Sequence, residues 1–508
     1  MVKERELSGM LPYEYEVEPT SAQITGHGGL LPYIDLACVL GVLEAVDDKV
    51  GVGGQQGWLD RQHVLALILL NLAGGECVED IGLLEADAGL CRIVREAERW
   101  GLSRAQRREL DKRFRRQRRR TFPSPTRLYE YLNEFHDPSQ EQQRQEGKAF
   151  IPAKNPHLQG LEEVNQALVV SVQRHAPTKE ATLDIDATIQ ETHKRQALCC
   201  YKGYRAYQPL SVYWAQTGLM VHSEFRDGNV PAGYDILRVL KGALEALPEG
   251  VERVGVRMDT AGYEHKTLRY MATGDEGRRA AIAFTVSCDM TGEFRRAAAQ
   301  VPESAWRPVA RRDGTKQEWA EVVYVPNAIA NSKRDPTYRY LAIRERLEQA
   351  VLEGMEAEAG QLPLPFATVV LEGRAYRLSG IVTNRDEEGE ELIRWHWERC
   401  GKSEEAHAIM KGDLAGGQLP SGRFGANAAW WAIVVLAYNL HMAMQLLASP
   451  GPLTGKRMKA LRFALIALPA RVVQRGRQLF VRIKGDHPAL AWLWQMRRKI
   501  GALAPACA

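Results

Sequence analysis

Three acidic residues that lie far apart in the chain could do chemistry together, because of the elements in which they stand. Asp186 lies in the alternating segment Ala181 to Gln190, which is typical of a strand. Asp259 ends a later strand-like segment, and Glu404 lies in a helical stretch. Sites collect at strand ends in open α/β sheets. Three carboxylates gathered there could hold two Mg²⁺ ions, with Mn²⁺ as a substitute, since these cations prefer oxygen ligands.

Such a pair of ions suits phosphodiester chemistry. Two metal ions about 4 Å apart activate a water or a 3′-hydroxyl and stabilise the leaving oxygen. Two of the three positions have a rival beside them. Asp184 shares a strand face with Asp186 and could take its place. Glu405 follows Glu404 but points about 100° away around the helix.

The helix that carries Glu404 has a pattern of its own. Ser403 is expected to cap it, and Glu404, His407 and Lys411 then lie along one face. A carboxylate, an imidazole and an ammonium in this order could hold a metal ion beside a phosphate. The alternative is an ordinary solvated helix with an acidic start and a basic end. We expect His407 to be a structural or DNA-facing neighbour rather than a ligand.

The elements that must position these residues predict an α/β fold. From Ala181 onward the chain shows three successive strands, followed by helix, strand, helix and strand. Hairpins followed by crossovers give a mixed sheet with helices packed on it. After this part, strand-like segments flank a predicted helical piece, Tyr338 to Gly354, and indicate a β-rich insertion.

Positive charge is unevenly spread, although the formal net charge is only +4. The C-terminal stretch after Asp413 contains a single acid, Asp486, among many Lys and Arg residues. Segregated charge of this kind suits a polyanion, most often nucleic acid, although a run of like charge can also be a solvated face. A basic run in the helical N-terminal part is the first candidate for DNA binding, with Arg113, Arg115, Arg116, Arg118, Arg119 and Arg120.

Composition points to the cytoplasm. The eight cysteines form no Cys-x-x-Cys, which argues against a zinc module and a secreted disulfide framework. The first residues lack the apolar core of a signal peptide. Ala426 to Ala448 is apolar enough to suggest a membrane span, but Asn427, Asn439 and His441 interrupt it. We therefore expect a buried core helix and no membrane partner.

Several motifs together resemble a known family. They are Asp184-Ile-Asp186-Ala-Thr188, Phe225-Arg-Asp-Gly-Asn229, Arg257-Met-Asp259-Thr-Ala-Gly262, and Glu404 with Lys411 beyond it. In this order they resemble the catalytic core of the DDE transposases of bacterial insertion sequences. The likeness is to the cut-and-paste branch, with an RNase H-like fold and a β-strand insertion between the second Asp and the Glu. It covers about residues 175 to 445.

The resemblance implies roles for individual residues. Asp186, Asp259 and Glu404 would be the catalytic metal ligands. That branch also carries a Tyr–Arg–Glu–Lys signature, in which Lys411 matches the Lys. The upstream part departs from the signature: the Tyr position holds Trp397, and the Arg position falls on Cys400, one residue after Arg399. Arg399 would then grip a DNA phosphate, while Trp397 would stack on a base or simply pack.

The resemblance also implies an activity. The enzyme would bind the terminal inverted repeats of its element, cleave double-stranded DNA there with two Mg²⁺, and join 3′-hydroxyl ends to target DNA. A homodimer holding paired ends in a bacterial cytoplasm, associated with the nucleoid, is expected. The alternatives are an RNase H-like nuclease without strand transfer and a catalytically silent DNA-binding relative.

The expected domains follow from these assignments. They are a helical N-terminal DNA-binding domain with its linker (1–157), the first part of an RNase H-like catalytic core (158–290), a β-rich insertion (291–390), the second part of the core (391–450) and a basic C-terminal region (451–508).

Overall fold

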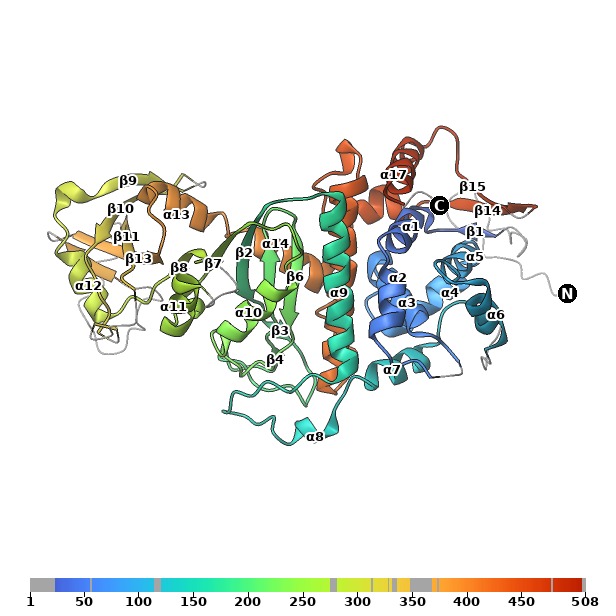
Figure 1. Ribbon diagram of the computed structural model, residues 1–508, viewed down its shortest axis with the longest axis horizontal. Helices are drawn as coiled ribbons and strands as arrows, with labels where there is room; N and C mark the ends of the chain where they lie inside the picture. The colour runs from blue at the N-terminus through green and yellow to red at the C-terminus, as the bar shows by residue number, and fades with distance from the viewer. Residues whose placement is uncertain are drawn as a thin grey trace, which may run out of the picture.

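The structure is a computed structural model of an elongated molecule, with helices at one end, a sheet in the middle and further strands at the other end (Figure 1). It describes residues 23–54, 57–113, 120–274, 281–311, 314–327, 329–330, 336–347, 368–371, 374–476 and 478–504.

A ten-stranded mixed sheet runs through the middle and the far end of the molecule, in the order β6-β5-β2-β7-β8-β13-β11-β10-β9, with β12 paired to β13. The predicted α/β class with a mixed sheet is thus confirmed. In its first part, β2 pairs antiparallel with β5 and parallel with β7, and β7 pairs parallel with β8. The strands of this part are β2 (Glu180–Ala187), β5 (Leu210–Trp214), β6 (Leu219–Glu224), β7 (Arg253–Met258) and β8 (Ala283–Ser287).

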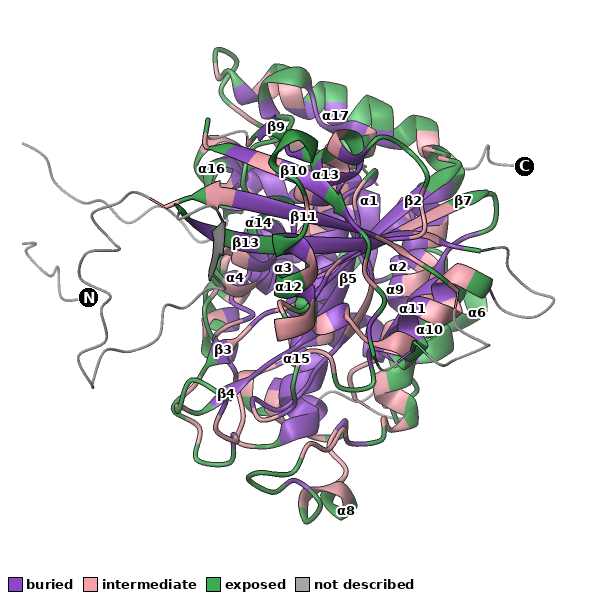
Figure 2. Ribbon diagram, turned by 90° about the vertical axis from the view of Figure 1, so that its left-hand side faces the viewer, coloured by how far each residue is buried: buried purple, intermediate pink, exposed green. Residues whose placement is uncertain are grey.

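These strands are buried, as the purple ribbons in Figure 2 show. All five residues of β5 are buried, as are Leu183 and Ile185 of β2. Strands buried on both faces need cover on both faces. Helices supply it, namely α9 (Pro156–His175), α10 (Ile236–Ala246), α11 (His265–Thr273), α13 (Gly389–Trp397) and α15 (Phe424–Ala443), each of which packs against a strand of this sheet.

The insertion strands extend the same sheet instead of forming a separate one. Val382 of β13 lies opposite Val286 of β8, in antiparallel pairing. The predicted helix over Tyr338 to Gly354 is wrong for the residues that the structure describes, because Arg339–Arg346 form strand β11. Partners on both sides, β10 and β13, satisfy its backbone. The insertion contains α12 (Gly292–Ala299), β9 (Arg307–Ala310), β10 (Lys316–Val322), β11, β12 (Thr368–Leu371) and β13 (Arg374–Thr383).

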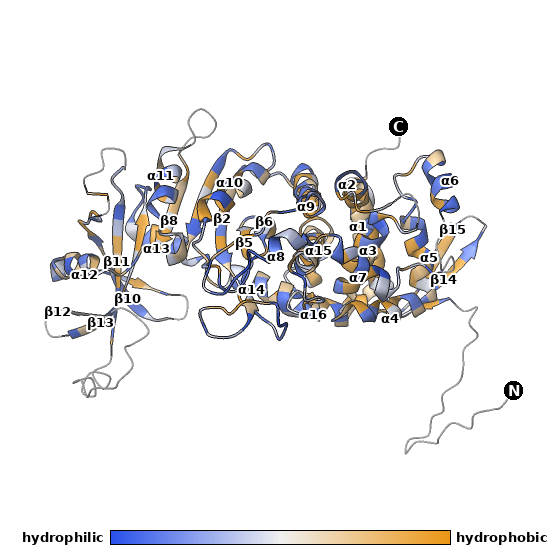
Figure 3. Cartoon of the chain, turned by 90° about the horizontal axis from the view of Figure 1, so that it is seen from below, coloured by the Kyte–Doolittle hydropathy of each residue, from blue (hydrophilic) through white to orange (hydrophobic). Residues whose placement is uncertain are grey.

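The N-terminal part is helical, as expected. The first two helices of this part are separated at Gly41, whose φ of 76° only glycine adopts readily. Helices such as α3 contain many hydrophobic residues, which are orange in Figure 3. The helices are α1 (Leu31–Val39), α2 (Val42–Lys49), α3 (Asp60–Ala73), α4 (Ile81–Ala86), α5 (Ala88–Ala97), α6 (Arg104–Lys112), α7 (Pro125–Asn133) and α8 (Pro138–Glu141).

Helix α15 joins the two parts. It packs against α3 and α7 on one side and against α9 and β6 on the other. It is long and apolar enough to cross a membrane, but most of it is buried inside the protein. Its Asn439 accepts a hydrogen bond from Met220 N at 2.8 Å and donates to Asn165 Oδ1 at 2.6 Å. The apolar stretch is therefore a helix of the protein core, as its interrupting polar residues predict.

The C-terminal residues return to the N-terminal helices, which the sequence did not predict. Hairpin β14 (Ala470–Arg475) and β15 (Gln478–Arg482) pairs with the short strand β1 (Ile24–Thr25). Helix α17 (Ala489–Leu503) packs against α1. One continuous cluster of buried apolar residues runs from Leu30 to Ile500. The domain boundaries proposed from the sequence stay a prediction.

Candidate active site

The two aspartates of the candidate site leave neighbouring parallel strands at the same edge of the sheet. The parallel register of β2 and β7 ends with Ile185 opposite Met258. The residues that come next along the chain are Asp186 and Asp259, respectively. Both line one cavity of about 820 Å³. Residues that are 73 positions apart in the chain are therefore brought together by strand pairing alone.

Asp259 is held by the turn that follows it. Its carboxylate accepts a hydrogen bond from Ala261 N at 3.0 Å, which caps the short 3₁₀ turn Thr260–Gly262. One oxygen is thus fixed by the backbone. This local bond orients the side chain beside the end of β7, where it lines the cavity.

Asp186 lies in the electrostatic field of the other two acids. Burial raises the pKa of its carboxyl group, the charge of Arg399 lowers it, and the charges of Asp259 and Glu404 raise it, so that the pKa lies at about 6. A neighbouring charge of the same sign disfavours the ionised form of a carboxyl group. The charges of Asp259, Glu404 and Arg399 therefore all act on Asp186.

His407 is the nearest basic neighbour of Asp186 that the structure describes. Its Nδ1 lies 3.7 Å from Asp186 Oδ2, and the side chain is almost fully buried. Burial, helped by the charge of Lys411, lowers the pKa of His407 to about 4. The imidazole is therefore neutral near pH 7. Its Nε2 is buried without a hydrogen-bond partner in the described part of the chain.

Glu404 belongs to helix α14 (Lys402–Ala408), which begins after Gly401. The prediction that Ser403 caps this helix is wrong, because Ser403 is buried inside its first turn. Gly401, with a φ of 91°, occupies the cap position. The carboxylate of Glu404 accepts a hydrogen bond from Gly401 N. The charge of Glu405 contributes to the raised pKa of Tyr213, after burial and the charge of Asp184, and to the raised pKa of Tyr438, after burial and the charge of Tyr213.

Lys411 follows on a π-helical turn, Ile409–Asp413. Its Nζ donates to Ile189 O at 3.1 Å, and the side chain lines the same cavity as Asp186 and Asp259. Burial lowers the pKa of Lys411, and the charge of Lys202 lowers it further. An ammonium group thus faces the two aspartates.

Asp184, the rival of Asp186, has a different partner. Its two oxygens accept hydrogen bonds from Nε and NH2 of Arg257, at 2.6 and 2.8 Å, and both side chains are buried. The NH1 group of Arg257 also donates to Trp395 O at 2.6 Å and to Glu398 at 3.2 Å. Arg257 therefore ties β2 and β7 to the end of α13, directly before the helix of Glu404.

This role of Arg257 was not predicted from the sequence. The signal was present, because Arg257 precedes Asp259 by two residues as Asp184 precedes Asp186. In the sheet these two earlier residues are register partners. A charged residue at such a position in a buried strand needs a partner of opposite charge.

The donor set suits a hard divalent cation, since Asp186, Asp259 and Glu404 offer carboxylate oxygens near one cavity. As the side chains stand, no three His, Cys, Asp or Glu residues in the described ranges are close enough to share one metal ion. The carboxylate of Glu404 is turned to its own helix cap. The chemistry of the three residues fits a hard divalent cation, which Asp186, Asp259 and Glu404 would hold.

The other predicted DNA contacts are less closely grouped. Arg113 donates to Gly57 O at 3.2 Å and to Gly54 O, and Arg120 donates to Phe122 O at 3.2 Å. Trp397 is half-buried, packs against the insertion strands and carries Arg311 over its ring at 5.6 Å. Four arginines of the predicted basic run lie outside the described residues, namely Arg115, Arg116, Arg118 and Arg119.

Comparison with known proteins adds three findings. No curated protein matches the chain. Among solved structures, the chain is similar to the piggyBac transposase in a synaptic complex with hairpin DNA, at 9% identity and a TM-score of 0.42, over 86% of this chain and 80% of that one. This likeness is too distant to inform the site. Residues 59–505, most of the chain, match the family described as "Transposase DDE domain group 1". The chain therefore belongs to the DDE transposase family.

Proposed function

We propose that this chain is a DNA transposase that binds the terminal inverted repeats of its own insertion sequence, cleaves the DNA at the ends, and joins the 3′-hydroxyl ends to target DNA. Membership of the DDE transposase family makes it a DNA-cleaving and strand-transferring enzyme in general terms. The repeats, the bacterial element and the cut-and-paste branch are the specific part of the proposal.

The observation that carries the proposal is a cavity lined by two carboxylates, with the charge of a third acid acting on one of them. Asp186 and Asp259 follow paired parallel strands and line one cavity, and the charge of Glu404 acts on Asp186. Burying like charges together is unfavourable unless a cation or a proton compensates them. Such an arrangement is typical of a site that binds divalent metal ions.

The sheet supports an RNase H-like core. Its first five strands run β6-β5-β2-β7-β8, with β5 antiparallel to both neighbours and β2, β7 and β8 parallel. The insertion follows Asp259 in the chain and ends before Glu404, as it does in the proposed branch.

Each residue has a distinct task in the proposed reaction. Asp186, Asp259 and Glu404 would hold two Mg²⁺ ions, which when bound activate a water or 3′-hydroxyl and stabilise the leaving oxygen. Neutral His407 beside Asp186 adds no positive charge that would repel a cation. Arg399 and Lys411 offer positive charge to the phosphates of the DNA strand.

Two copies of the chain would act together in the nucleoid of a bacterial cytoplasm, because two transposon ends must be held at once. The basic C-terminal region, with one acid after Asp413, and the N-terminal arginines would bind double-stranded DNA away from the acids.

The test compares Asp259→Ala with wild type and with a matched control, Asp289→Ala. Asp289 is exposed, lies two residues after the end of β8 and does not line the cavity. The substrate is a plasmid that carries the coding region with its flanking DNA, incubated with Mg²⁺ or Mn²⁺. We expect wild type and Asp289→Ala to nick this plasmid and to join pre-cut ends. Asp259→Ala should retain DNA binding and lose both reactions.

Normal cleavage by Asp259→Ala would refute the assignment of the site. Nicking without any joining of pre-cut ends would identify a nuclease without strand transfer. A wild-type protein that binds the DNA but stays inactive with either metal would be a catalytically silent relative.

A further inference from the structure

A loop lines the same cavity as the candidate acids. It connects β3 (Gln190–Glu191) with β4 (Ala206–Tyr207), which pair as a small separate sheet. Residues Tyr201 and Lys202 of this loop line the same cavity as Asp186 and Asp259. The role proposed above leaves these two residues without a task.

The side chains of Tyr201 and Lys202 form an exposed pair. The side chain of Tyr201 is 78% exposed, among the largest values for a hydrophobic or aromatic residue that the structure describes. Lys202 Nζ lies over the Tyr201 ring, 5.9 Å from its centroid. An exposed ring with a cation at its face is a surface on which a nucleobase can stack and a phosphate can bind.

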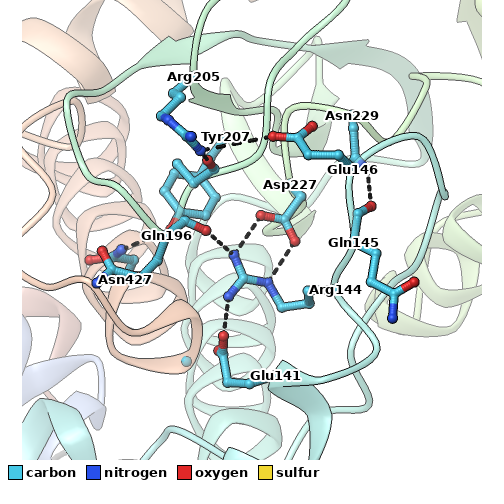
Figure 4. Close-up of polar contacts among 12 residues, drawn as sticks. Glu141, Arg144, Gln145, Glu146, Gln196, Arg205, Tyr207, Asp227, Asn229 and Asn427 are labelled. Atoms are coloured by element: carbon cyan, nitrogen blue, oxygen red, sulfur yellow. Dashed lines mark hydrogen bonds and ion pairs between the residues drawn. The ribbon is translucent and has the colours of Figure 1, made fainter.

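Arg144 holds the start of this loop through hydrogen bonds, which Figure 4 shows. This arginine, whose side chain is 2% exposed, lies in the predicted linker between the helical part and the sheet. Its Nε and NH2 each donate to the carboxylate of Asp227 at 2.8 Å. The NH2 group also donates to Gln196 O at 3.1 Å, and NH1 donates to Glu141 at 2.6 Å. Arg144 thus connects the linker, the end of β6 and the start of the loop.

Further contacts hold the middle of the loop. The carboxylate of Glu146 accepts hydrogen bonds from Cys199 N at 3.1 Å. Arg205 donates to Ala197 O across the loop and lies 3.8 Å from Glu146. Gly228 passes so close that a Cβ there would lie 2.6 Å from Ala206 O. These contacts fix the backbone of the loop that carries Tyr201 and Lys202.

The charges across the cavity are complementary to a nucleic-acid strand. Lys202 lowers the pKa of Lys411, after burial, so the two ammonium groups face the same space. In the part of the chain that the structure describes, neither ammonium group forms an ion pair with a carboxylate. Two unpaired cations beside two carboxylates leave a position for a phosphate next to the position for a metal ion.

We propose that the loop of residues 196–205 is the second wall of a nucleotide subsite in the catalytic cavity. Lys202 and Lys411 bind one phosphate of the strand that enters the cavity, and Tyr201 stacks on the base of a nucleotide that is unpaired there. This inference rests on the proposed function for the nature of the strand. It adds a preference for DNA whose strands are separated at the cut.

Binding, rather than cleavage, tests the subsite. The probes are a fluorescein-labelled single-stranded oligonucleotide and a blunt duplex of the same sequence, with the full chain in EDTA. The variants are Tyr201→Leu and Lys202→Gln, with Arg195→Gln as the control. Arg195 is exposed, directly precedes the loop of residues 196–205 and does not line the cavity. All three side chains are exposed, so the variants should fold, which thermal melting verifies.

The expected results differ between the variants. Tyr201→Leu should weaken single-strand binding by about tenfold, because stacking on an aromatic ring contributes about that factor per base. Its duplex binding should stay near the wild-type value. Lys202→Gln should reduce the slope of log affinity against log salt concentration by about 0.7 for the single strand. Arg195→Gln should bind the single strand without the loss of affinity expected for Tyr201→Leu.

A crosslinking measurement locates the contact. An oligonucleotide with 5-iododeoxyuridine, irradiated on the metal-free protein, should attach to the peptide that contains Tyr201. This attachment should disappear in Tyr201→Leu. Equal affinities for Tyr201→Leu and wild type, an equal loss on duplex and single strand, or a wild type that does not bind the oligonucleotide would overturn the subsite. If wild type nicks DNA with Mg²⁺ while the variants bind normally, only the subsite fails. If no DNA is cleaved, the binding results still decide the subsite.

Discussion

Arg257 and Asp184 face each other across strands β7 and β2 as a buried two-point ion pair, with donor–acceptor distances of 2.6 and 2.8 Å. This pair assigns different tasks to two aspartates that the sequence could not separate. Asp184 fixes the strands and, through Arg257, the end of α13. Asp186, two residues later, keeps its carboxylate at the cavity.

Removing Asp184 should therefore lower the free energy of unfolding, in addition to any effect on DNA cleavage. Asp184→Ala leaves the guanidinium of Arg257 buried with only part of its partners, and we expect a loss of about 3–5 kcal/mol in the free energy of unfolding. Urea denaturation of the metal-free protein measures this change. Asp186→Ala is the comparison, and an equal loss in both variants would contradict the division of tasks.

The pH dependence of stability should change when Asp186 is neutralised. Burial raises its pKa from 3.8 to about 6, so the folded protein binds a proton more tightly than the unfolded chain. The cost of the buried charge is absent below pH 4, grows through pH 6 and is complete above it, where it amounts to about 3 kcal/mol. In EDTA at pH 8, Asp186→Asn should be more stable than wild type, and this gain should vanish near pH 4. A gain that is equal at both pH values would exclude Asp186 as its source.

Substitutions of Glu404 and Glu405 should differ in their effects, as substitutions of the two aspartates should. Glu404→Gln keeps an oxygen that can accept from Gly401 N, so the helix should stay intact by circular dichroism. DNA cleavage should be lost, because an amide is a poorer ligand than a carboxylate for a hard cation. Glu405→Gln, at a position that points about 100° away around the helix, should cleave as wild type does. The reverse result would exchange the two assignments.

Arg144 should control the rigidity of the loop that carries Tyr201. Arg144→Ala leaves Asp227 buried and unpaired, which costs about 3–5 kcal/mol. Amide hydrogen exchange should increase in residues 196–205. The double variant Arg144→Met with Asp227→Leu removes both charges and should recover much of the stability, while the loop stays unfastened. Unchanged exchange in the loop of that double variant would exclude Arg144 as its support.

The sequence predicted the two aspartates because their signals are local. Alternation marks the strand of Asp186, and a strand end marks Asp259. The direction of the side chains was not predictable in this way. Asp184 and Asp186 share a strand face, and only the position of Arg257 on the next strand distinguishes them.

Features that depend on distant partners were missed. Strand β11 contains Leu, Ala, Glu and Arg, which favour helices, but β10 and β13 pair with it on both sides. Context of this kind overrides intrinsic propensity. Arg144 and Asp227 lie 83 residues apart, and neither carries a local signal of the other.

The sheet formed by β1, β14 and β15 has a consequence for biosynthesis. Ile24 and Thr25 pair with Arg471 and Ala470, and α1 packs against α17. On a ribosome these early residues must wait until strands β14 and β15 have been synthesised. The helices of the N-terminal part can begin to form, but their outer layer closes only after those strands have emerged. A message that is cut short would therefore yield a product whose first helices lack their covering strands.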